Sequence, residues 1–436
     1  MKPMSAHVAG GDAARLNVLI VSEHASARFG GEAALGLHYF RVLRERAVNV
    51  RLVTHARTRP ELERLFGGDP RILYVEDTAA QRLLSRLGHH LPHHLAHFTL
   101  GFVSRVITQR AQRRLVRRLA ARERIDVVHQ PMPVSPREPS MLYGLGAPVV
   151  IGPMNGGMRY PPGFGARESR LARAALAAGR AASEAMNRLI PGKRDAALLL
   201  VANPRTRAAL PRCALGAVVD VVENGVDLRL WQAQPAAAPS RDAPATFVFM
   251  GRLVALKCVD VLLEALADAA ARVPMRLVIV GDGPMRPALE QQAARSNLSA
   301  SVHFTGWLPQ AECAAQLQWA DALVMPSVRE CGGAVVLEAM AMGKPVIATA
   351  WGGPADYLDA RCGVLVEPRD RAALVKGFAA AMQRLAASPD DRAALGRAGR
   401  EKVLRDYDWE VKVDRMLALY ARVQPAGGDR LAVAPQ

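Results

Sequence analysis

Cysteine is scarce in this chain, and its spacing excludes two common roles. The 436 residues contain five cysteines, none in a C-x-x-C pair or in the cysteine–histidine pattern of a zinc site. We therefore expect reduced thiols in a cytoplasmic protein and no metal site. Zinc-finger and RNA-recognition motifs are missing as well, so we expect no nucleic-acid partner.

Long apolar runs are also missing, although half of the residues are hydrophobic. No segment combines roughly eighteen apolar residues with freedom from glycine and proline, so we expect no membrane-spanning helix. Near the amino terminus only residues 18–21, VLIV, are consecutive strong apolar residues. This short run predicts a first strand and not a signal peptide.

Short apolar runs instead alternate with alanine-rich helical stretches. Residues 18–21 and 276–280 are examples, and their valine, isoleucine and leucine content is typical of buried strands. The alternation predicts βαβ repeats, parallel sheets and an α/β fold. A chain of this length holds two or three domains. The stretch 232–245, rich in alanine, proline and serine, reads as a linker between residues 1–231 and 246–405.

Positive charge is concentrated in the first half of the chain. The formal net charge is +17, and nearly all of the excess lies in residues 1–240. Eight arginines and a single glutamate occur over Arg105–Arg124, with apolar residues between them at roughly helical spacing. Two interpretations stay open: a basic amphipathic helix on an anionic membrane surface, or a solvated helix packed on its own domain.

The segment ECGGAVVLE, with Glu330 and Glu338 at its ends, is the most informative motif. Its glycines predict a turn that leaves backbone N–H groups open at the start of the following helix, which is an anion site. Glu338, about one turn inside that helix, suits the hydroxyls of a ribose. The motif therefore predicts a nucleoside diphosphate carrying a further group. The backbone expected to bind it comprises Gly332, Gly333, Ala334 and Val335.

Two cations follow the strand expected to open the second domain. Arg252 and Lys257 lie in a strand-to-helix loop that begins at Gly251. In doubly wound sheets such loops bind ligands at the carboxyl edge. Two fixed cations would stabilise the negative charge that develops on a departing diphosphate. We expect these three residues to bind the donor, and the two cations to remove any need for a metal or other cofactor.

The two glutamates resemble the glutamate–seven–glutamate motif of the group 1, or family 4, retaining glycosyltransferases. The Asn-Gly-Val-Asp stretch at 224–227 matches that family as well, and the resemblance is strongest over residues 246–358. It implies the GT-B fold, an α/β architecture of two Rossmann-like domains with parallel sheets facing a central cleft. Residues 1–231 would form the acceptor-side domain and residues 246–405 the nucleotide-sugar domain. The terminal helix, 406–425, would pack back on the first.

The resemblance implies an enzyme that transfers a hexosyl group, with retention of configuration, from a nucleotide diphosphate sugar to a glycan or lipid-linked acceptor. Cell-surface or exopolysaccharide assembly is the expected role, at the inner face of a membrane with an anionic surface. Glu330 would hold the sugar hydroxyls, while Arg252 and Lys257 would hold the diphosphate. A nucleotide-sugar epimerase or hydrolase, and a non-catalytic sugar-nucleotide-binding partner, are the alternatives.

The first domain resembles the family less closely. Gly30 and Gly31, in the loop after the first strand, would let backbone approach the donor closely. Many relatives have two histidines after a later strand, and here His129 is the first while Pro131 stands in place of the second. Either His129 acts in catalysis, or the following segment supplies the polar contacts. In that following segment the candidates for contact on the acceptor side are Asn155, Gly156 and Gly157.

Overall fold

The computed structural model describes residues 16–88, 100–167, 170–233 and 243–424. The chain forms two compact units, and each is described by itself. The first comprises Met1–Gly157, Ala175–Glu223 and Lys412–Gln436, and the second comprises Met158–Ala174 and Asn224–Val411. Residues 234–242 of the predicted linker and the end of the predicted terminal helix, residue 425, lie outside the described residues.

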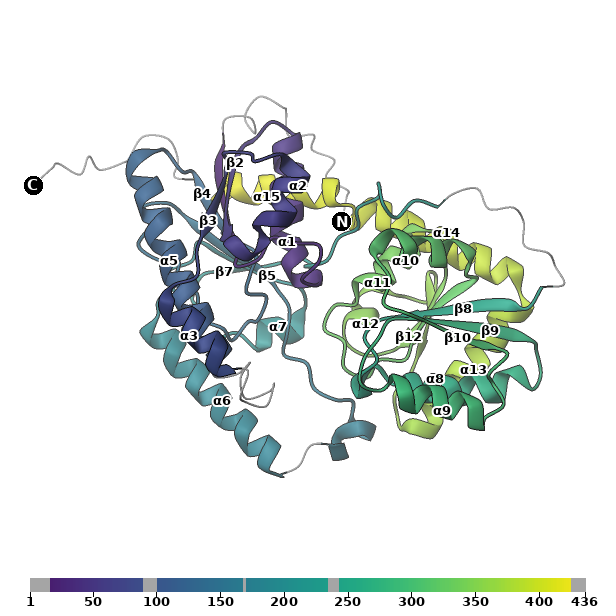
Figure 1. Cartoon of the computed structure of the whole chain (residues 1–436). Coiled ribbons are helices and arrows are strands. Elements are labelled where there is room, and N and C mark those ends of the chain that lie inside the picture. Colours follow the sequence, from purple (N-terminus) through teal and green to yellow (C-terminus); the bar gives the residue numbers. More distant parts are fainter. Residues whose placement is uncertain (1–15, 89–99, 168–169, 234–242, 425–436) are drawn as a thin grey trace, which may run out of the picture. The chain divides into compact units, whose positions relative to one another are not determined.

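The first unit is built on a seven-stranded parallel sheet with the order β3-β2-β1-β4-β5-β6-β7 (Figure 1). The central strands are runs of valine, leucine and isoleucine that are buried on both faces, as parallel sheets require. The strands are β1 (Asn17–Val21), β2 (Asn49–His55), β3 (Ile72–Val75), β4 (Val127–Gln130), β5 (Val149–Met154), β6 (Leu198–Val201) and β7 (Ala217–Asp220).

Helices connect these strands and cover the sheet. The segments are α1 (Gly31–Glu45), η2 (Ala56–Thr58), α2 (Arg59–Phe66), α3 (Ala79–Gly88), α5 (Leu100–Arg122), α6 (Arg170–Leu189) and α7 (Pro204–Ala208). Asn203 caps α7 by accepting a hydrogen bond from the Thr206 amide, and Pro204 follows at the first helical position. The amino-terminal turn of α6 belongs to the second unit.

Helix α5 carries the arginine-rich segment, and its apolar side faces inward. Val116 is fully buried, and Leu115 and Leu119 pack against the core of the first unit. Buried glutamines on the same side bind neighbouring elements, since Gln112 Nε2 donates to the Ser22 carbonyl at 3.0 Å. The helix therefore packs on its own domain through Leu115, Val116 and Leu119.

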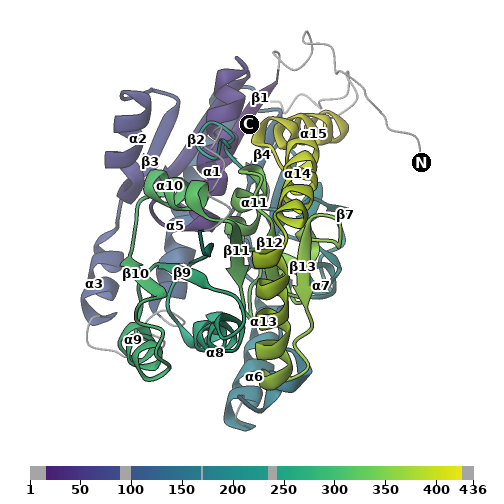
Figure 2. The same ribbon diagram turned by 90° about the vertical axis from the view of Figure 1, so that its right-hand side faces the viewer.

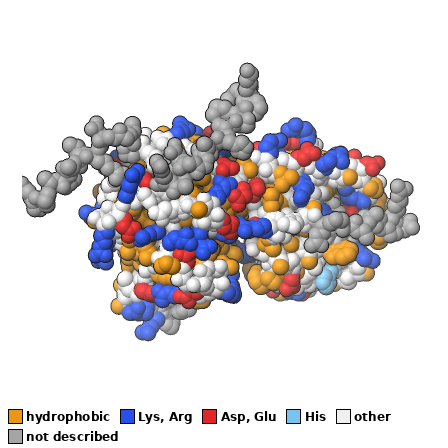
Figure 3. All heavy atoms as spheres, turned by 90° about the horizontal axis from the view of Figure 1, so that it is seen from above, with side chains coloured by type: hydrophobic (Ala, Val, Ile, Leu, Met, Phe, Trp, Pro, Cys, Tyr) orange, Lys and Arg blue, Asp and Glu red, His pale blue; other side chains and the backbone are white. Residues whose placement is uncertain are grey.

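Five arginines of α5 point away from that core and form a surface that we call the α5 arginine face. Arg113 is not part of it, because its guanidinium stacks on the Tyr143 ring at 3.8 Å and donates to the Tyr143 carbonyl. In the view of Figure 3, basic, acidic and apolar side chains alternate over both units. The α5 arginine face comprises Arg110, Arg114, Arg117, Arg118 and Arg122.

The second unit has a six-stranded parallel sheet with the order β10-β9-β8-β11-β12-β13. Figures 1 and 2 show α8, α9 and α13 on one face of it and α10, α11 and α14 on the other. Its strands are β8 (Ala245–Met250), β9 (Met275–Val280), β10 (Val302–Gly306), β11 (Ala322–Met325), β12 (Val346–Thr349) and β13 (Gly363–Val366).

The helical segments of the second unit follow its strands in alternation. They are η3 (Pro162–Arg167), η4 (Ala255–Lys257), α8 (Val259–Ala270), α9 (Arg286–Arg295), α10 (Gln310–Trp319), α11 (Ala334–Ala341), α12 (Gly353–Tyr357), α13 (Arg371–Ala387) and α14 (Pro389–Asp406). The last helix, α15 (Trp409–Val423), belongs to the first unit from Lys412 onward. None of the helices in the described part of the chain combines the length and apolar character needed to span a bilayer.

Strand order places a ligand-binding edge in the second unit. Strands β9 and β10 follow β8 outward on one side of it. The next strand, β11, lies on the other side of β8, with Leu323 paired to Val248. The order therefore reverses between β8 and β11. Open α/β sheets bind ligands at such a switch point, beyond the carboxyl ends of the strands.

Candidate active site

The loops after β8 and β11 bring Lys257 and Glu330 together at this switch point. Lys257 Nζ donates to Glu330 Oε2, and each side chain is 16% exposed. The loops are also joined through backbone, because the Val328 amide donates to the Leu256 carbonyl at 3.1 Å. Two residues 73 positions apart thus form one ion pair that ligand can reach.

Glycines allow the neighbouring loops to pack backbone against backbone. Gly251 has a positive φ, and a Cβ there would lie 3.8 Å from Lys257 Nζ. A Cβ on Gly281, after β9, would lie 2.0 Å from the Gly251 carbonyl oxygen. The loop after β12 is equally close, since a Cβ on Gly352 would lie 2.2 Å from the Glu330 carbonyl oxygen. A larger residue at Gly281 or Gly352 would therefore clash with the backbone of the loop that carries Lys257 or Glu330.

Helix α11 begins directly beside this ion pair. Gly333 precedes it with φ 84°, and no side chain caps its amino terminus. Within the described residues, the Ala334 and Val335 amides have no hydrogen-bond acceptor. Two free N–H groups at a helix start, next to a lysine, form a site for a phosphate.

Glu338 lies inside α11 and differs from Glu330 in having no partner. No hydrogen bond or ion pair joins its carboxyl group to another described residue. Burial raises the pKa of this half-buried side chain to about 7. An enclosed carboxyl without a donor is suited to accept hydrogen bonds from ligand hydroxyls.

Arg252 lies in the same loop as Lys257 and is exposed. In the described part of the chain its guanidinium makes no ion pair, in contrast to Lys257. The structure therefore places both predicted cations after β8, one already paired with Glu330 and the other open to solvent. To bind a diphosphate at the amino terminus of α11, Lys257 would have to exchange its bond with Glu330, whereas Arg252 could bind without breaking an ion pair.

A segment from the first half of the chain completes this edge of the second unit. Met158 Cε lies 2.8 Å from the position of a Cβ on Gly352, and the Arg329 guanidinium lies 5.3 Å from the centre of the Tyr160 ring. Trp351 Nε1 donates to the Arg159 carbonyl at 2.8 Å. Residues 158–160 thus flank the Glu330 loop, a role that the sequence interpretation missed.

His129 occupies a different environment from the one expected of a catalytic residue. It is completely buried, with Nε2 donating to the Gly152 carbonyl and Nδ1 accepting from the Tyr420 hydroxyl, each at 2.6 Å. Burial lowers its pKa to about 4, so the ring is neutral. Both nitrogens are occupied and no surface is exposed. In this structure the ring joins β4, β5 and α15, and its catalytic role stays a prediction.

The acceptor-side candidates at the end of β5 are also engaged by protein. The buried Asn155 side chain donates to Glu223 Oε1 at 2.6 Å. The Gly156 amide donates to Thr206 Oγ1 at 3.0 Å, and a Cβ on Gly157 would lie 2.7 Å from the Arg205 carbonyl oxygen. This segment anchors β5 to α7, and its side-chain amide is not free for a ligand.

Gly30 lies in the exposed loop before α1, and Gly31 is the exposed first residue of that helix. Gly30 has φ 97°, which favours glycine, and a Cβ on either residue would meet open space. The buried Glu61 of α2 holds the start of this loop by accepting from the Ala27 amide at 2.9 Å. Both residues are exposed, as the predicted contact with the donor requires, and that contact stays a prediction.

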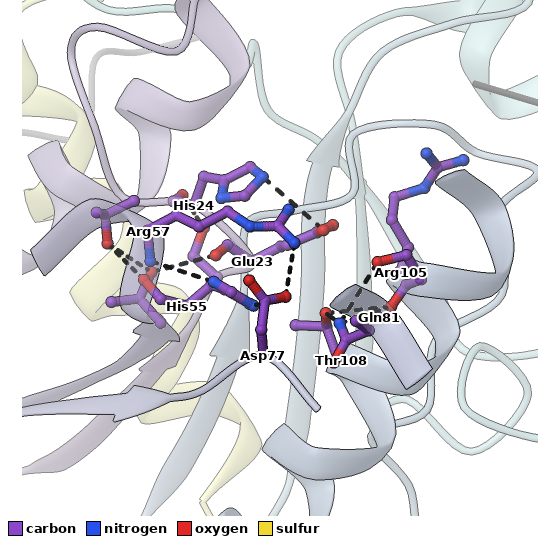
Figure 4. Close-up of polar contacts among 12 residues, drawn as sticks. Glu23, His24, His55, Arg57, Asp77, Gln81, Arg105 and Thr108 are labelled. Carbon is purple, nitrogen blue, oxygen red and sulfur yellow. Dashed lines mark hydrogen bonds and ion pairs between the residues drawn. The ribbon is translucent and has the colours of Figure 1, made fainter. Parts of the chain in front are cut away.

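A polar cluster at the carboxyl edge of the first sheet was not foreseen (Figure 4). Its members follow β1, β2 and β3 or project from α5 and the β4–β5 connection. The signal that could have located it is a charged residue two positions after the end of each of these strands, namely Glu23, Arg57 and Asp77, since those ends share one sheet edge. We call it the β1–β3 edge cluster, and it comprises Glu23, His24, His55, Arg57, Asp77, Arg105 and Glu138.

Ion pairs organise this cluster. Arg57 binds Asp77 at 2.7 Å, and Arg105 binds Glu138 at 3.1 Å. Glu23 lies between them, with Arg57 and Asp77 on one side and Arg105 of α5 on the other (Figure 4). Burial, and secondarily the Glu138 charge, raises the pKa of Glu23 to about 7 against the lowering effect of both arginines.

The described residues contain no group of three or more His, Cys, Asp or Glu side chains arranged to hold a metal ion. The polar groups at the two sheet edges are arginine, lysine and histidine side chains, carboxylates and backbone amides. The second-unit edge has the parts for a diphosphate and a diol. The first-unit edge has carboxylates and guanidiniums in near balance.

Comparison with known proteins identifies the protein family and the fold that this chain resembles. Residues 244–388 match the family described as glycosyl transferases group 1. The structure is similar to that of HepE from Anabaena in complex with UDP, with a TM-score of 0.63 and 16% identity over 93% of this chain and 100% of that one. The two parallel-sheet units thus have the GT-B fold, which confirms the predicted fold class.

Curated relatives agree with this class. Glycogen synthase from Mycobacterium tuberculosis is 32% identical over 47% of this chain and 48% of its own length. A GDP-mannose-dependent phosphatidylinositol monomannoside mannosyltransferase from Mycolicibacterium smegmatis is 36% identical over 39% of this chain and 46% of its own length. The chain spans about half the length of the curated relatives it matches. The match to the group 1 glycosyltransferase family falls within its second unit, and the predicted resemblance is confirmed.

Proposed function

We propose that the protein is a retaining hexosyltransferase that uses a nucleotide diphosphate sugar and a glycan or lipid-linked acceptor. The observation that carries the proposal is the Lys257–Glu330 pair beside the free amides of α11. A diphosphate at that terminus would accept from the Ala334 and Val335 amides. Arg252 and Lys257 would stabilise the charge that grows on it as the glycosidic bond breaks.

The carboxylates have separate roles in this proposal. Glu338, with no partner of its own, accepts hydrogen bonds from the ribose hydroxyls. Glu330 exchanges its bond with Lys257 for bonds to the sugar hydroxyls, while the lysine turns to the phosphate. The departing phosphate oxygen accepts the proton of the acceptor hydroxyl on the same face. Retention of configuration follows from the family resemblance, and a metal has no assigned step.

The nucleotide is expected to carry uracil or guanine. Uracil is supported by the UDP bound to the similar HepE structure, and guanine by the GDP-mannose dependence of the mycobacterial relative. A thermal-shift screen of UDP-, GDP- and ADP-sugars tests this directly. A ligand at 100 times its Kd should stabilise the folded protein by about 2.7 kcal/mol.

A matched pair of variants separates specific from general binding in that screen. Lys257→Ala should abolish most of the shift, whereas Lys376→Ala, an exposed lysine on α13, should keep it. Absence of a shift with every sugar nucleotide would contradict the proposal. Turnover of the donor with no acceptor present would favour an epimerase or hydrolase instead, and binding without turnover on any acceptor a non-catalytic role.

We further propose that the protein works at the inner face of a membrane in cell-surface or exopolysaccharide assembly. The support is the basic first half of the chain and the α5 arginine face. Because the apolar side of α5 is packed inward, attachment would be by charge alone. Such attachment weakens with salt, since the Debye length falls from about 10 Å at 0.1 M to about 3 Å at 1 M.

A further inference from the structure

We propose that residues 158–164 form a strap that positions Glu330 for the donor sugar, with Trp351 and Tyr160 as the positioning residues. We call this segment the 158–164 strap. It follows Gly157, the last residue of a first-unit segment, yet it belongs to the second unit. The inference rests on the proposed function, in which Glu330 binds the sugar hydroxyls. It adds residues that act on the sugar through Glu330 and not by direct contact.

The carboxyl-terminal end of the strap is anchored in the core of the second unit. Phe164 is 5% exposed and belongs to the hydrophobic core around α8 and α13. A Cβ on Gly163 would clash with the Arg369 carbonyl oxygen, so the strap backbone lies directly against the loop before α13. Pro161 restricts the backbone ahead of this anchor, and its carbonyl accepts a hydrogen bond from the Phe164 amide at 2.9 Å. This end of the strap is therefore held by packing and by a closed turn.

The amino-terminal end of the strap contacts two loops at the carboxyl edge of the sheet. Trp351, in the loop after β12, donates its indole N–H to the Arg159 carbonyl at 2.8 Å. Arg329, in the loop after β11, has its guanidinium 5.3 Å from the centre of the Tyr160 ring. Arg329 directly precedes Glu330 in the chain. The strap thus contacts both loops that surround the carboxylate assigned to the sugar.

Backbone contacts join these two loops to each other. The Gly353 amide donates to the Glu330 carbonyl at 2.9 Å, and a Cβ on Gly353 would clash with the Gly332 carbonyl oxygen. Trp351 is two residues before Gly353, so it connects the strap to the Glu330 backbone. The Glu330 side chain is bound separately by Lys257. The position of the carboxylate therefore depends on the strap through the backbone and on the lysine through the side chain.

This arrangement separates the sugar from the diphosphate. The strap contacts the segments 329–330 and 351–352, whereas the diphosphate is assigned to Arg252, Lys257 and the first amides of α11. A binding group keeps its productive position only when the residues around it are themselves fixed. Loosening the strap should therefore weaken the binding of the sugar and spare that of the nucleoside diphosphate. A general loss of stability would not discriminate between the two.

The experiment uses the full chain and calorimetry with two probe pairs, UDP with UDP-glucose and GDP with GDP-mannose. Trp351→Phe keeps an aromatic side chain and removes the N–H that donates to Arg159. It should weaken binding of the sugar nucleotide on the order of 5-fold, the scale of one hydrogen bond, and leave the Kd of the free nucleotide unchanged. In the Glu330→Gln background, Trp351→Phe should cause no further loss, because it acts through Glu330. Unchanged affinity for the sugar nucleotide in Trp351→Phe, or an equal loss in both backgrounds, overturns the inference.

Trp319→Phe is the matched control, because Trp319 is 79% exposed and ends α10, shortly before β11 begins at the opposite edge of the sheet. It should leave the Kd of both members of each probe pair unchanged. If Trp351→Phe fails to fold, Tyr160→Leu, which removes the ring beside Arg329, should give the same selective loss.

A measurement without ligand distinguishes this inference from the proposed function. Hydrogen–deuterium exchange in the peptide covering residues 329–333 should be faster in Trp351→Phe than in wild type, and unchanged in Trp319→Phe. Equal exchange in Trp351→Phe and wild type overturns the inference alone, whatever the nucleotides do. Failure of wild type to bind any of the four nucleotides, with the exchange difference present, would instead refute the proposed function.

Discussion

Glu338 should make donor binding depend on pH in a manner that can be calculated. Burial holds the pKa of its carboxyl group at about 7, against an ordinary value of 4.5, and no described residue donates to it. Ribose hydroxyls that donate to the carboxylate would favour the ionised form and lower that pKa in the complex. The ligand-free protein must then release a proton on binding at pH values between the pKa in the complex and about 7.

The size of the effect follows from this shift. If the pKa in the complex falls to the ordinary value, the Kd for the donor at pH 6 should be about 10-fold that at pH 8. A nucleotide sugar is the right ligand, since its diphosphate carries no terminal group that titrates in this range. Calorimetry in buffers of different ionisation enthalpy would also detect the released proton directly.

Glu338→Gln provides the control for this prediction. The variant should bind the donor more weakly at pH 8 and with no pH dependence between pH 6 and pH 8. The ligand-free variant should also be more stable than wild type at pH 8 and similar at pH 5. The sign follows because the raised pKa makes the ionised group unfavourable in the folded state as pH rises from 4.5 through 7. A pH-independent wild-type Kd would refute this reasoning.

The remaining predictions concern charge. Arg252→Ala and Lys257→Ala should each reduce kcat/KM by roughly 100- to 1000-fold, the scale of losing one preorganised donor, and wild-type rates would contradict their assignment. Glu330→Gln should impair sugar transfer yet preserve affinity for free nucleoside diphosphate, because it releases Lys257 to the phosphate; calorimetry showing a loss equal to that of Glu338→Gln would argue against separate roles. Replacing the α5 arginine face with glutamine should reduce sedimentation with anionic vesicles at low salt and leave nucleotide binding intact; a wild type that ignores such vesicles would exclude charge-driven attachment.

The candidate donor site could be proposed from the sequence because its signals are local. Glu330, two glycines and Glu338 fall within nine consecutive residues, and Lys257 follows a glycine that ends a strand. Strand patterning then places both segments at one sheet edge. The direct pairing of Lys257 with Glu330 and the place of residues 158–160 beside the Glu330 loop needed the structure, because strand order and chain path decide which segments are neighbours.

The β1–β3 edge cluster shows why the rest was harder to predict. Glu23, Arg57, Arg105 and Glu138 are separated by tens of residues, and no periodicity links them. Helix α5 was ambiguous for a related reason, since helical spacing identifies an apolar side but not what covers it. His129 fitted a family pattern in sequence, yet the Tyr420 hydroxyl from the last helix reaches it from 291 residues away and encloses it.

Hydrogen–deuterium exchange with and without UDP or GDP tests the central claim most directly. The claim is that the diphosphate lies at the carboxyl edge of the second-unit sheet, on the amides that open α11. Nucleotide should therefore slow exchange in peptides covering residues 251–258 and 330–338, with Ala334 and Val335 gaining acceptors that the described residues do not provide. Protection confined to other segments, with these two peptides unchanged at saturating nucleotide, would contradict the account.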